Sequence, residues 1–382
     1  MKKAIINTTI IMPDYIIPDG VIVIDGDTIS EFGKSSEIST EGMEIYDAKN
    51  GYTGPGLIDI HTHAGDTIPF DINPVLAAKR CLEHGITDVL PAPVYSQDKS
   101  QWLKMISLIK DLKAKGELEN VSGLYMEGPY LNPAFGANRD SSPWAGDISE
   151  EKFKEIVDES LGLARVWCIA PERNGIEKFI NYVKKVDPNV SFAVAHSEAE
   201  PYQIERFIPD GLKITTHHTN ATGTIQRYPE CRSACVDEAT LYNPEIYAEL
   251  ICDKVGIHVE PYILRLTKKI KGDDKIILIS DCSNNDGPVP DAKKYAGADD
   301  IFFDHLGEIS GTKLTLDRAC RNMMVHTGAS LCQIFKYASL NPASAVGFTD
   351  KGCVRVGNVA NLVTVNDKFD ILGVYLNGKK VK

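Results

Sequence analysis

Two histidines separated by a single residue, His61 and His63, are the first feature of the sequence with clear chemical potential. They follow a short apolar run, and residues two apart on an extended strand point to the same side. Imidazole nitrogens suit zinc and similar transition-metal ions, and a carboxylate can complete or bridge such a site. Alone, a His-x-His pair indicates little, because structural or solvated pairs are about as frequent.

Further metal-binding or ionisable side chains stand at the ends of other apolar runs. These residues are Glu127, His196, His217, His218, His258 and Asp281. Six of the nine histidines thus follow runs that resemble strands. Such placement at one end of many strands favours a shared metal site over scattered surface histidines.

The runs that precede these residues alternate with stretches of helical periodicity. The predicted strands are Leu57–Ile60, Ile86–Leu90, Val121–Met126, Arg165–Ile169, Val190–Ala195, Leu212–Thr216, Val255–Val259 and Lys275–Ser280. The predicted helices include Asn73–Glu83, Ser100–Lys115, Ile176–Val186, Pro244–Cys252 and Pro261–Ile270. Eight strand–helix repeats predict a parallel (β/α)₈ barrel over residues 54–349, whose catalytic groups would project from the C-terminal strand ends. No Gly-x-Gly-x-x-Gly turn follows the first strand, which weakens a dinucleotide-binding alternative.

Both ends of the chain read as short β-strands separated by turn signals. The expected strands are Ala4–Ile11, Gly20–Ile24, Thr28–Phe32, Glu44–Ala48, Asn361–Val365 and Ile371–Leu376. We therefore expect a small β-sandwich domain built from residues 1–53 and 350–382. Two unrelated terminal hairpins are the alternative.

The amino-acid composition excludes some classes of binding partner. Forty-one Lys and Arg residues against 53 Asp and Glu give a net charge of −12, which argues against nucleic-acid binding. No apolar run approaches the length that crosses a bilayer, so no membrane partner is expected. The nine cysteines are dispersed, which is typical of a reducing compartment, and we expect a cytoplasmic protein.

Beyond these patterns, the sequence resembles the amidohydrolase superfamily and, within it, the N-acetylglucosamine-6-phosphate deacetylase family. The matching segments run nearly from end to end. They include PGLIDIHTH at 55–63, EGPYLN at 127–132, APE at 170–172, AHS at 195–197, THHTNA at 216–221, GIHV at 256–259, ISD at 279–281, GTKLT at 311–315, NPASAVG at 341–347 and GNVANLV at 357–363. The resemblance implies a metal-dependent deacetylase with a β-sandwich beside the barrel.

The resemblance also implies a set of metal ligands. Glu127, His196 and His217 would hold the principal divalent ion, and His61 and His63 could hold a second that Glu127 bridges. Zinc is the expected metal, with iron, cobalt, manganese or nickel as alternatives. Whether one or two ions bind stays open.

Asp281 would be the catalytic residue of such an enzyme. On this analogy it takes a proton from the attacking water and returns it to the departing amine. It could also contribute to the second metal site. Members of the family are homodimers in which residues near the Arg227 segment reach the neighbouring subunit, so we expect a homodimer.

By the same resemblance Asn220, Ala221, Arg227 and His258 would bind a sugar phosphate. Asn138 stands where the family usually has a histidine that polarises the substrate carbonyl. It would donate a hydrogen bond instead but carries no charge, so stabilisation of the oxyanion would be weaker or transferred to Arg139. This departure, with others near the substrate, leaves two substrate classes open: an N-acetylamino-sugar 6-phosphate, or another N-acyl substrate, even an unphosphorylated one. A scaffold that has lost catalysis is disfavoured because all the expected metal ligands are present.

Overall fold

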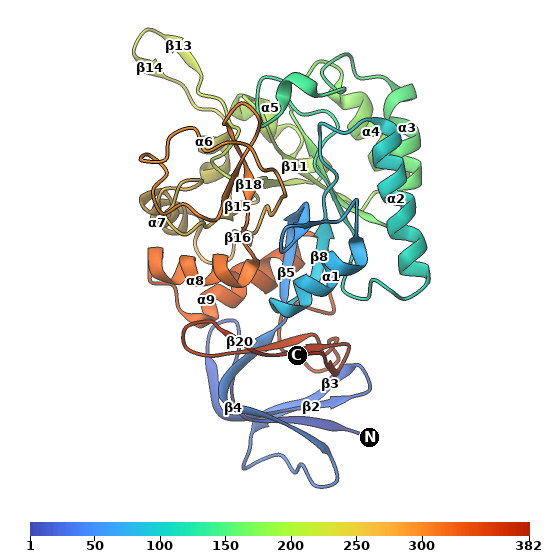
Figure 1. Ribbon diagram of the computed structural model, residues 1–382, viewed down its shortest axis with the longest axis vertical. Helices are drawn as coiled ribbons and strands as arrows, with labels where there is room; N and C mark the ends of the chain where they lie inside the picture. The colour runs from blue at the N-terminus through green and yellow to red at the C-terminus, as the bar shows by residue number, and fades with distance from the viewer.

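The computed structural model describes residues 1–140 and 142–382. Figure 1 shows a sheet that contains both chain termini below a larger part built from strands and helices. The larger part carries the residues expected to do chemistry.

The sheet at the termini has seven strands in the described chain, in the order β21-β20-β19-β4-β1-β2-β3. Their bounds are β1 Lys3–Ile11, β2 Ile16–Asp25, β3 Thr28–Lys34, β4 Glu44–Pro55, β19 Leu362–Val365, β20 Ile371–Leu376 and β21 Lys379–Lys380. A bridge between Thr28 and Val359 curls the sheet towards closure. Buried apolar side chains such as Ile22, Leu362 and Tyr375 fill its interior. Both ends therefore build one sheet; β4 runs past the expected boundary at residue 53, and the division into two domains stays a proposal.

The larger part is a barrel of eight strands within the residues described. The strands are β5 Leu57–Thr62, β8 Ile86–Pro91, β9 Leu124–Met126, β10 Ala164–Ile169, β11 Ser191–Val194, β12 Leu212–Thr215, β15 Tyr247–Ile251 and β16 Ile276–Ile279. Strands β9 to β16 pair in parallel, β5 pairs with β8, and a bridge from Val89 to Val121 joins the two ladders. The Asp281 amide donates to the His61 carbonyl at 3.0 Å and closes the ring. The predicted TIM-type barrel with a small terminal sheet domain is confirmed.

Helices surround the barrel (Figure 1). They are α1 Pro74–Glu83, α2 Lys99–Ala114, α3 Glu150–Glu159, α4 Ile176–Val186, α5 Pro201–Glu205, α6 Val236–Tyr242, α7 Pro261–Lys271, α8 Leu316–Thr327, α9 Leu331–Phe335 and α10 Asn341–Ala345. In α4 the buried residues Ile176, Phe179, Ile180 and Val183 recur at helical spacing and form one apolar face. No helix in the described chain is both long enough and apolar enough to cross a membrane.

The seventh barrel strand differs from the prediction. It is β15, Tyr247–Ile251, whereas Pro244–Cys252 was expected to be helical and Val255–Val259 to be the strand. Ala248, Glu249 and Leu250 are strong helix formers, so local propensity pointed the wrong way. Burial between neighbouring strands overrides that propensity here. His258 consequently lies in a loop beyond the strand.

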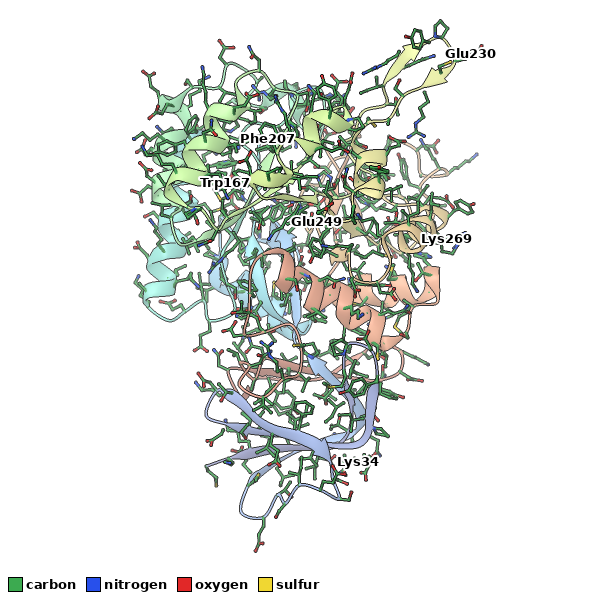
Figure 2. The ribbon with its side chains drawn as sticks, turned by 180° about the vertical axis from the view of Figure 1, so that it is seen from behind. Lys34, Trp167, Phe207, Glu230, Glu249 and Lys269 are labelled. Atoms are coloured by element: carbon green, nitrogen blue, oxygen red, sulfur yellow. The ribbon has the colours of Figure 1, made fainter. Side chains whose placement is uncertain are left out.

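Small hairpins stand at the C-terminal side of the barrel strands. They are β6 Ala64–Gly65 with β7 Ile68–Pro69, β13 Gln226–Tyr228 with β14 Cys231–Arg232, and β17 Ile301–Phe303 with β18 Ile309–Thr312. The β13–β14 hairpin projects from the body of the molecule in Figure 1, and Glu230, labelled in Figure 2, lies at its far end.

Candidate active site

The expected metal ligands meet where the barrel strands end. His61 belongs to β5 and His63 follows it, Glu127 follows β9, His196 lies two residues beyond β11, and His217 lies two beyond β12. Asp281 lies two residues after β16. Parallel strands bring their C-terminal ends to one face of a barrel, so six residues from distant segments converge. Five of the six line one pocket of about 560 Å³, and His61 is buried beneath them.

Backbone geometry aims three of these side chains. His196, His217 and Asp281 have positive φ angles of 42°, 32° and 44°. Non-glycine residues in this region cost about 1–3 kcal/mol each, and such strain gathers at functional sites. The sharp turn directly after each strand directs the side chain towards the pocket.

Glu127 is the centre of the cluster. Its Oε1 lies 3.2 Å from His196 Nε2 and 3.3 Å from His217 Nε2. Its Oε2 lies 3.1 Å from His63 Nε2 and 3.7 Å from His61 Nε2. Two groups of three potential ligands therefore share this carboxylate, each with its ligand atoms within 4.8 Å of one another.

The donor set fits a divalent transition metal. Three of the four imidazoles and the carboxylate are buried, His63 is partly buried, and the Nε2 atom of His61 lacks a hydrogen-bond partner in the described structure. Unpartnered buried nitrogens are costly unless a ligand satisfies them. Imidazole and carboxylate ligands are those that zinc and its neighbours accept.

Neighbouring charges within the cluster shift the pKa values of its side chains in the direction opposite to the shift that burial causes. Burial alone would raise the pKa of the Glu127 carboxyl, but the His61 charge and hydrogen bonds from His196 and His217 hold that pKa well below its usual range. Burial likewise favours neutral imidazoles, yet Glu127 raises the pKa of both His61 and His63. The Glu127 carboxylate is therefore ionised and surrounded by imidazoles, so it can ligate a cation.

Asp281 stands beside this cluster and reaches the pocket. Its Oδ1 lies 3.5 Å from His63 Nε2 and 4.0 Å from His61 Nε2. Its side chain is 12% exposed, so it faces both the ligand groups and the pocket space. A carboxylate in this position can accept a proton from a water molecule beside the cluster.

Glu249, on β15, is a buried acidic residue that no motif in the sequence indicated. Its Oε2 lies 3.5 Å from His61 Nδ1 and accepts the His217 backbone N–H at 3.3 Å. The Tyr125 ring stacks against the face of the His61 ring, with centroids 4.4 Å apart. These two residues hold the His61 imidazole in place, and Figure 2 labels Glu249 within the barrel. In the sequence, Glu249 is a single acidic residue within a stretch of helical periodicity, so nothing there indicated that it would contact His61.

The expected sugar-binding residues divide into two sets. Asn220, Ala221 and His258 line the pocket together with Asn138. Asp253 fixes His258: its carboxylate accepts the His258 amide at 2.7 Å and lies 3.4 Å from the ring Nδ1. His218 points elsewhere, buried with its Nδ1 3.5 Å from Asp237.

Arg227 does not line this pocket. It lies on β13 of the projecting hairpin, 55% exposed, and pairs with Glu200. The single chain therefore does not bring Arg227 to Asn220 and Ala221. Sequence spacing gives the place of a residue along the chain but not whether its side chain reaches the pocket.

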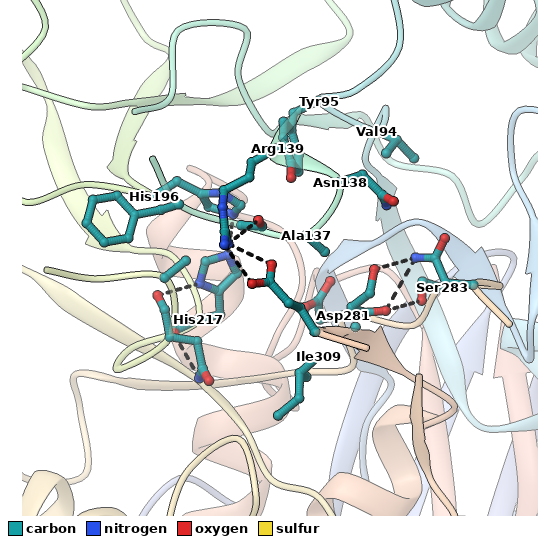
Figure 3. A pocket seen from close by; sticks show the side chains of 18 of the residues that line it. Val94, Tyr95, Ala137, Asn138, Arg139, His196, His217, Asp281, Ser283 and Ile309 are labelled. Carbon is teal, nitrogen blue, oxygen red and sulfur yellow. Dashed lines mark hydrogen bonds and ion pairs between the residues drawn. The ribbon is translucent and has the colours of Figure 1, made fainter. Parts of the chain in front are cut away.

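Two further features of the pocket were not predicted. Arg139 and Glu308 form a two-pronged ion pair, with both N–O distances 2.6 Å, between the loop after β9 and the β17–β18 hairpin (Figure 3). Tyr95, which follows β8, packs its ring edge against His196 with centroids 5.1 Å apart. Burial, followed by the nearby Glu127 charge, raises the pKa of the Tyr95 hydroxyl, which therefore keeps its proton.

Comparison with known proteins agrees with this geometry. Residues 53–381 match the model of the amidohydrolase family. The chain is 26% identical to an N-acetylglucosamine-6-phosphate deacetylase from Bacillus subtilis, covering 96% of this chain and 93% of that protein. It is also 26% identical to an N-acetylgalactosamine-6-phosphate deacetylase from Escherichia coli O157:H7, over 85% and 86%.

A crystal structure of N-acetylglucosamine-6-phosphate deacetylase from Pasteurella multocida has the same fold. It superposes with a TM-score of 0.85 at 24% identity, covering 100% of this chain and 99% of that one. Amidohydrolases are metal-dependent hydrolytic enzymes, and the two groups around Glu127 supply candidate ligands. The family model covers most of the sequence, from the end of β4 to the penultimate residue, and the chain belongs to the amidohydrolase family.

Proposed function

We propose that the protein hydrolyses the N-acetyl group of an N-acetylamino-sugar 6-phosphate, with N-acetylglucosamine 6-phosphate as the first candidate. The products would be acetate and the amino-sugar 6-phosphate. The observation that carries this proposal is the buried Glu127–His196–His217 group facing Asp281 across one pocket. The curated relatives are named for this reaction, on glucosamine and galactosamine substrates.

Glu127, His196 and His217 would hold the principal metal ion, and His61 with His63 a second. Zinc is the proposed ion, with iron, cobalt, manganese or nickel as alternatives. A bound divalent ion supplies Lewis acidity, which lowers the pKa of water and polarises an amide carbonyl. The chain's own contribution is to hold the ligands rigid, since His61 is fixed by Glu249 and Tyr125.

Asp281 would act as general base and then general acid. It accepts a proton from water as the water oxygen bonds to the acetyl carbon. It then gives that proton to the sugar nitrogen as the C–N bond breaks, which leaves acetic acid and a neutral amine; the acid then loses its remaining proton to solvent and becomes acetate. Its place beside His63 and at the pocket surface supports this role.

Asn220, Ala221 and His258 are the proposed partners of the sugar phosphate within one chain. We propose that Arg227 joins them from a second copy, in a homodimer. The exposed hairpin that carries Arg227 extends away from its own pocket, which supports a contribution to a neighbouring subunit. An arginine suits a phosphate group because its guanidinium can donate two hydrogen bonds at once.

The charge of the pocket supports a second class of substrate, N-acyl compounds without a phosphate. Among the described residues that line it, Arg139 is the one Lys or Arg, and Glu308 already neutralises it. Without a cation from a partner, an unphosphorylated N-acyl substrate fits this pocket better than a dianion.

A substrate panel tests the proposal and separates the two classes. Metal-loaded protein would be given N-acetylglucosamine, N-acetylgalactosamine and N-acetylmannosamine, each with and without the 6-phosphate, and acetate release would be measured. We expect turnover of a phosphorylated sugar. Preference for an unphosphorylated sugar would favour the alternative, and no acetate from any of the six would refute the deacetylase assignment.

We also propose that the protein acts in the cytoplasm. Its nine cysteines are free thiols, most of them buried, as is usual in a reducing compartment.

A further inference from the structure

Tyr95 lines the pocket but has no assigned role in the proposed reaction. It follows β8 and is 9% exposed. Its ring lies edge-on against His196. In Figure 3 the Tyr95 oxygen is at the end of the ring that faces the pocket interior.

The Tyr95 hydroxyl has no hydrogen-bond partner among the described residues. A buried hydroxyl without a partner is destabilising, so it indicates a ligand that completes the bond. The loop opposite comes close enough to enclose it because residue 136 is a glycine with φ of +88°. A Cβ at Gly136 would lie 3.0 Å from the Tyr95 oxygen and 2.3 Å from His196 Nδ1.

Asn138, the residue expected to donate to the substrate carbonyl, is held through its side-chain oxygen and its backbone. Its Oδ1 lies 3.1 Å from His305 Nδ1, and its backbone N–H donates to Asp304 at 3.0 Å. Both contacts draw Asn138 towards the loop between β17 and β18. They make Asn138 an anchor of the loop over the pocket.

We propose that Tyr95 is a catalytic residue whose hydroxyl donates a hydrogen bond to the acetyl oxygen of the substrate. This inference rests on the proposed deacetylase function. As water adds to the acetyl carbon, the carbonyl π electrons move to that oxygen, and a donor already in place stabilises the developing charge. Tyr95 keeps its proton throughout, so the reaction balances without it: Asp281 alone moves a proton from water to the leaving nitrogen.

The location beside His196 supports this placement. His196 belongs to the principal ligand group, beside which the proposed reaction places the acetyl carbonyl. The Tyr95 ring and His196 share one wall of the pocket, so the hydroxyl approaches the same space from the side. A supporting role towards His196 Nδ1 is the competing explanation, and it predicts a change in metal binding.

The test compares Tyr95→Phe with two other variants. Tyr95→Phe keeps the ring packing and removes only the hydroxyl. Tyr130→Phe is the matched control, because Tyr130 is also buried but its hydroxyl faces the Ser149 carbonyl, away from the pocket. Asn138→Ala tests the residue that the sequence favoured. Steady-state kinetics on the best substrate of the panel would be measured with metal content and melting temperature.

We expect Tyr95→Phe to lower kcat about 100-fold while KM changes less than about threefold, with metal content and melting temperature unchanged. Tyr130→Phe should retain wild-type kcat, and Asn138→Ala should lose less kcat than Tyr95→Phe. Wild-type kcat in Tyr95→Phe, or loss of metal from it, would overturn the inference while leaving the deacetylase function standing. A wild-type protein that releases no acetate would instead refute the proposed function, and this inference with it.

Discussion

The Glu249 carboxylate lies 3.5 Å from Nδ1 of His61, while the Nε2 of the same ring faces Glu127. One imidazole is thus held between a supporting carboxylate and a ligand carboxylate. Histidines that bind metals usually present one nitrogen to the ion and the other to such a partner. The arrangement explains how a fully buried acidic residue is tolerated on β15.

Replacement of Glu249 by Gln should weaken metal binding about 10- to 100-fold, because the amide cannot carry the charge that orients His61. Titration of metal-free protein with Zn²⁺ against a chelator would measure the change. Glu245→Gln is the control, since Glu245 is exposed on the same segment and should bind as wild type does. Equal affinity in Glu249→Gln would show that the contact does not position His61.

Asp281→Asn should reduce kcat by about 10²- to 10⁴-fold, because the amide keeps the shape but cannot accept a proton from water. Elemental analysis of the same sample should find the principal ion still bound by Glu127, His196 and His217. A variant with near wild-type kcat would remove Asp281 from the role of base.

Arg227→Ala should raise KM for the phosphorylated sugar roughly 10- to 150-fold and scarcely change kinetics with an unphosphorylated sugar. Arg232→Ala is a matched control on the same hairpin, where Arg232 pairs with Glu238 as Arg227 pairs with Glu200. Equal effects on both sugars would mean that Arg227 is structural.

Mixing subunits tests whether Arg227 acts across a dimer. At a substrate concentration near the wild-type KM, Arg227→Ala and Asp281→Asn chains exchanged into mixed dimers should regain activity, because one of the two sites then has both residues intact. A protein that is monomeric by light scattering and fully active would contradict the dimer.

Asp253 links stability to pH. Burial raises its pKa, but His258 and the backbone N–H groups of residues 257 and 258 together lower it to about 2. Because this folded-state pKa lies below the ordinary value near 4, Asp253 stabilises the fold above pH 4 and loses that contribution as the pH falls towards 2. Asp253→Asn should therefore cost about 2–3 kcal/mol at pH 5 and progressively less near pH 2. Urea unfolding across this range measures the difference, and a pH-independent gap would contradict the assignment.

The strand-end residues could be predicted because motif and topology agree: His61, Glu127, His196 and Asp281 each follow an apolar run, and a parallel barrel brings such ends together. Strand β15 could not, because Ala248, Glu249 and Leu250 favour helices locally and only their neighbours make them a strand.

Other parts of the site depend on contacts that no spacing encodes. Tyr95 stands in an ordinary loop sequence, and its importance follows from His196 and Gly136 lying beside it. The motif context of Arg227 likewise could not place it, because its position on an extended hairpin depends on the path of the chain in space.

The central claim is that this pocket releases acetate from an N-acetylamino-sugar 6-phosphate. Proton NMR of N-acetylglucosamine 6-phosphate incubated with metal-loaded protein tests it most directly, because the amide methyl signal and the acetate signal are both observed. We expect acetate and glucosamine 6-phosphate to appear in equal amounts, and we expect the Asp281→Asn protein to form neither at a comparable rate. An amide signal that persists with metal-loaded wild-type protein, for this sugar and for its galactosamine and mannosamine counterparts, would contradict it.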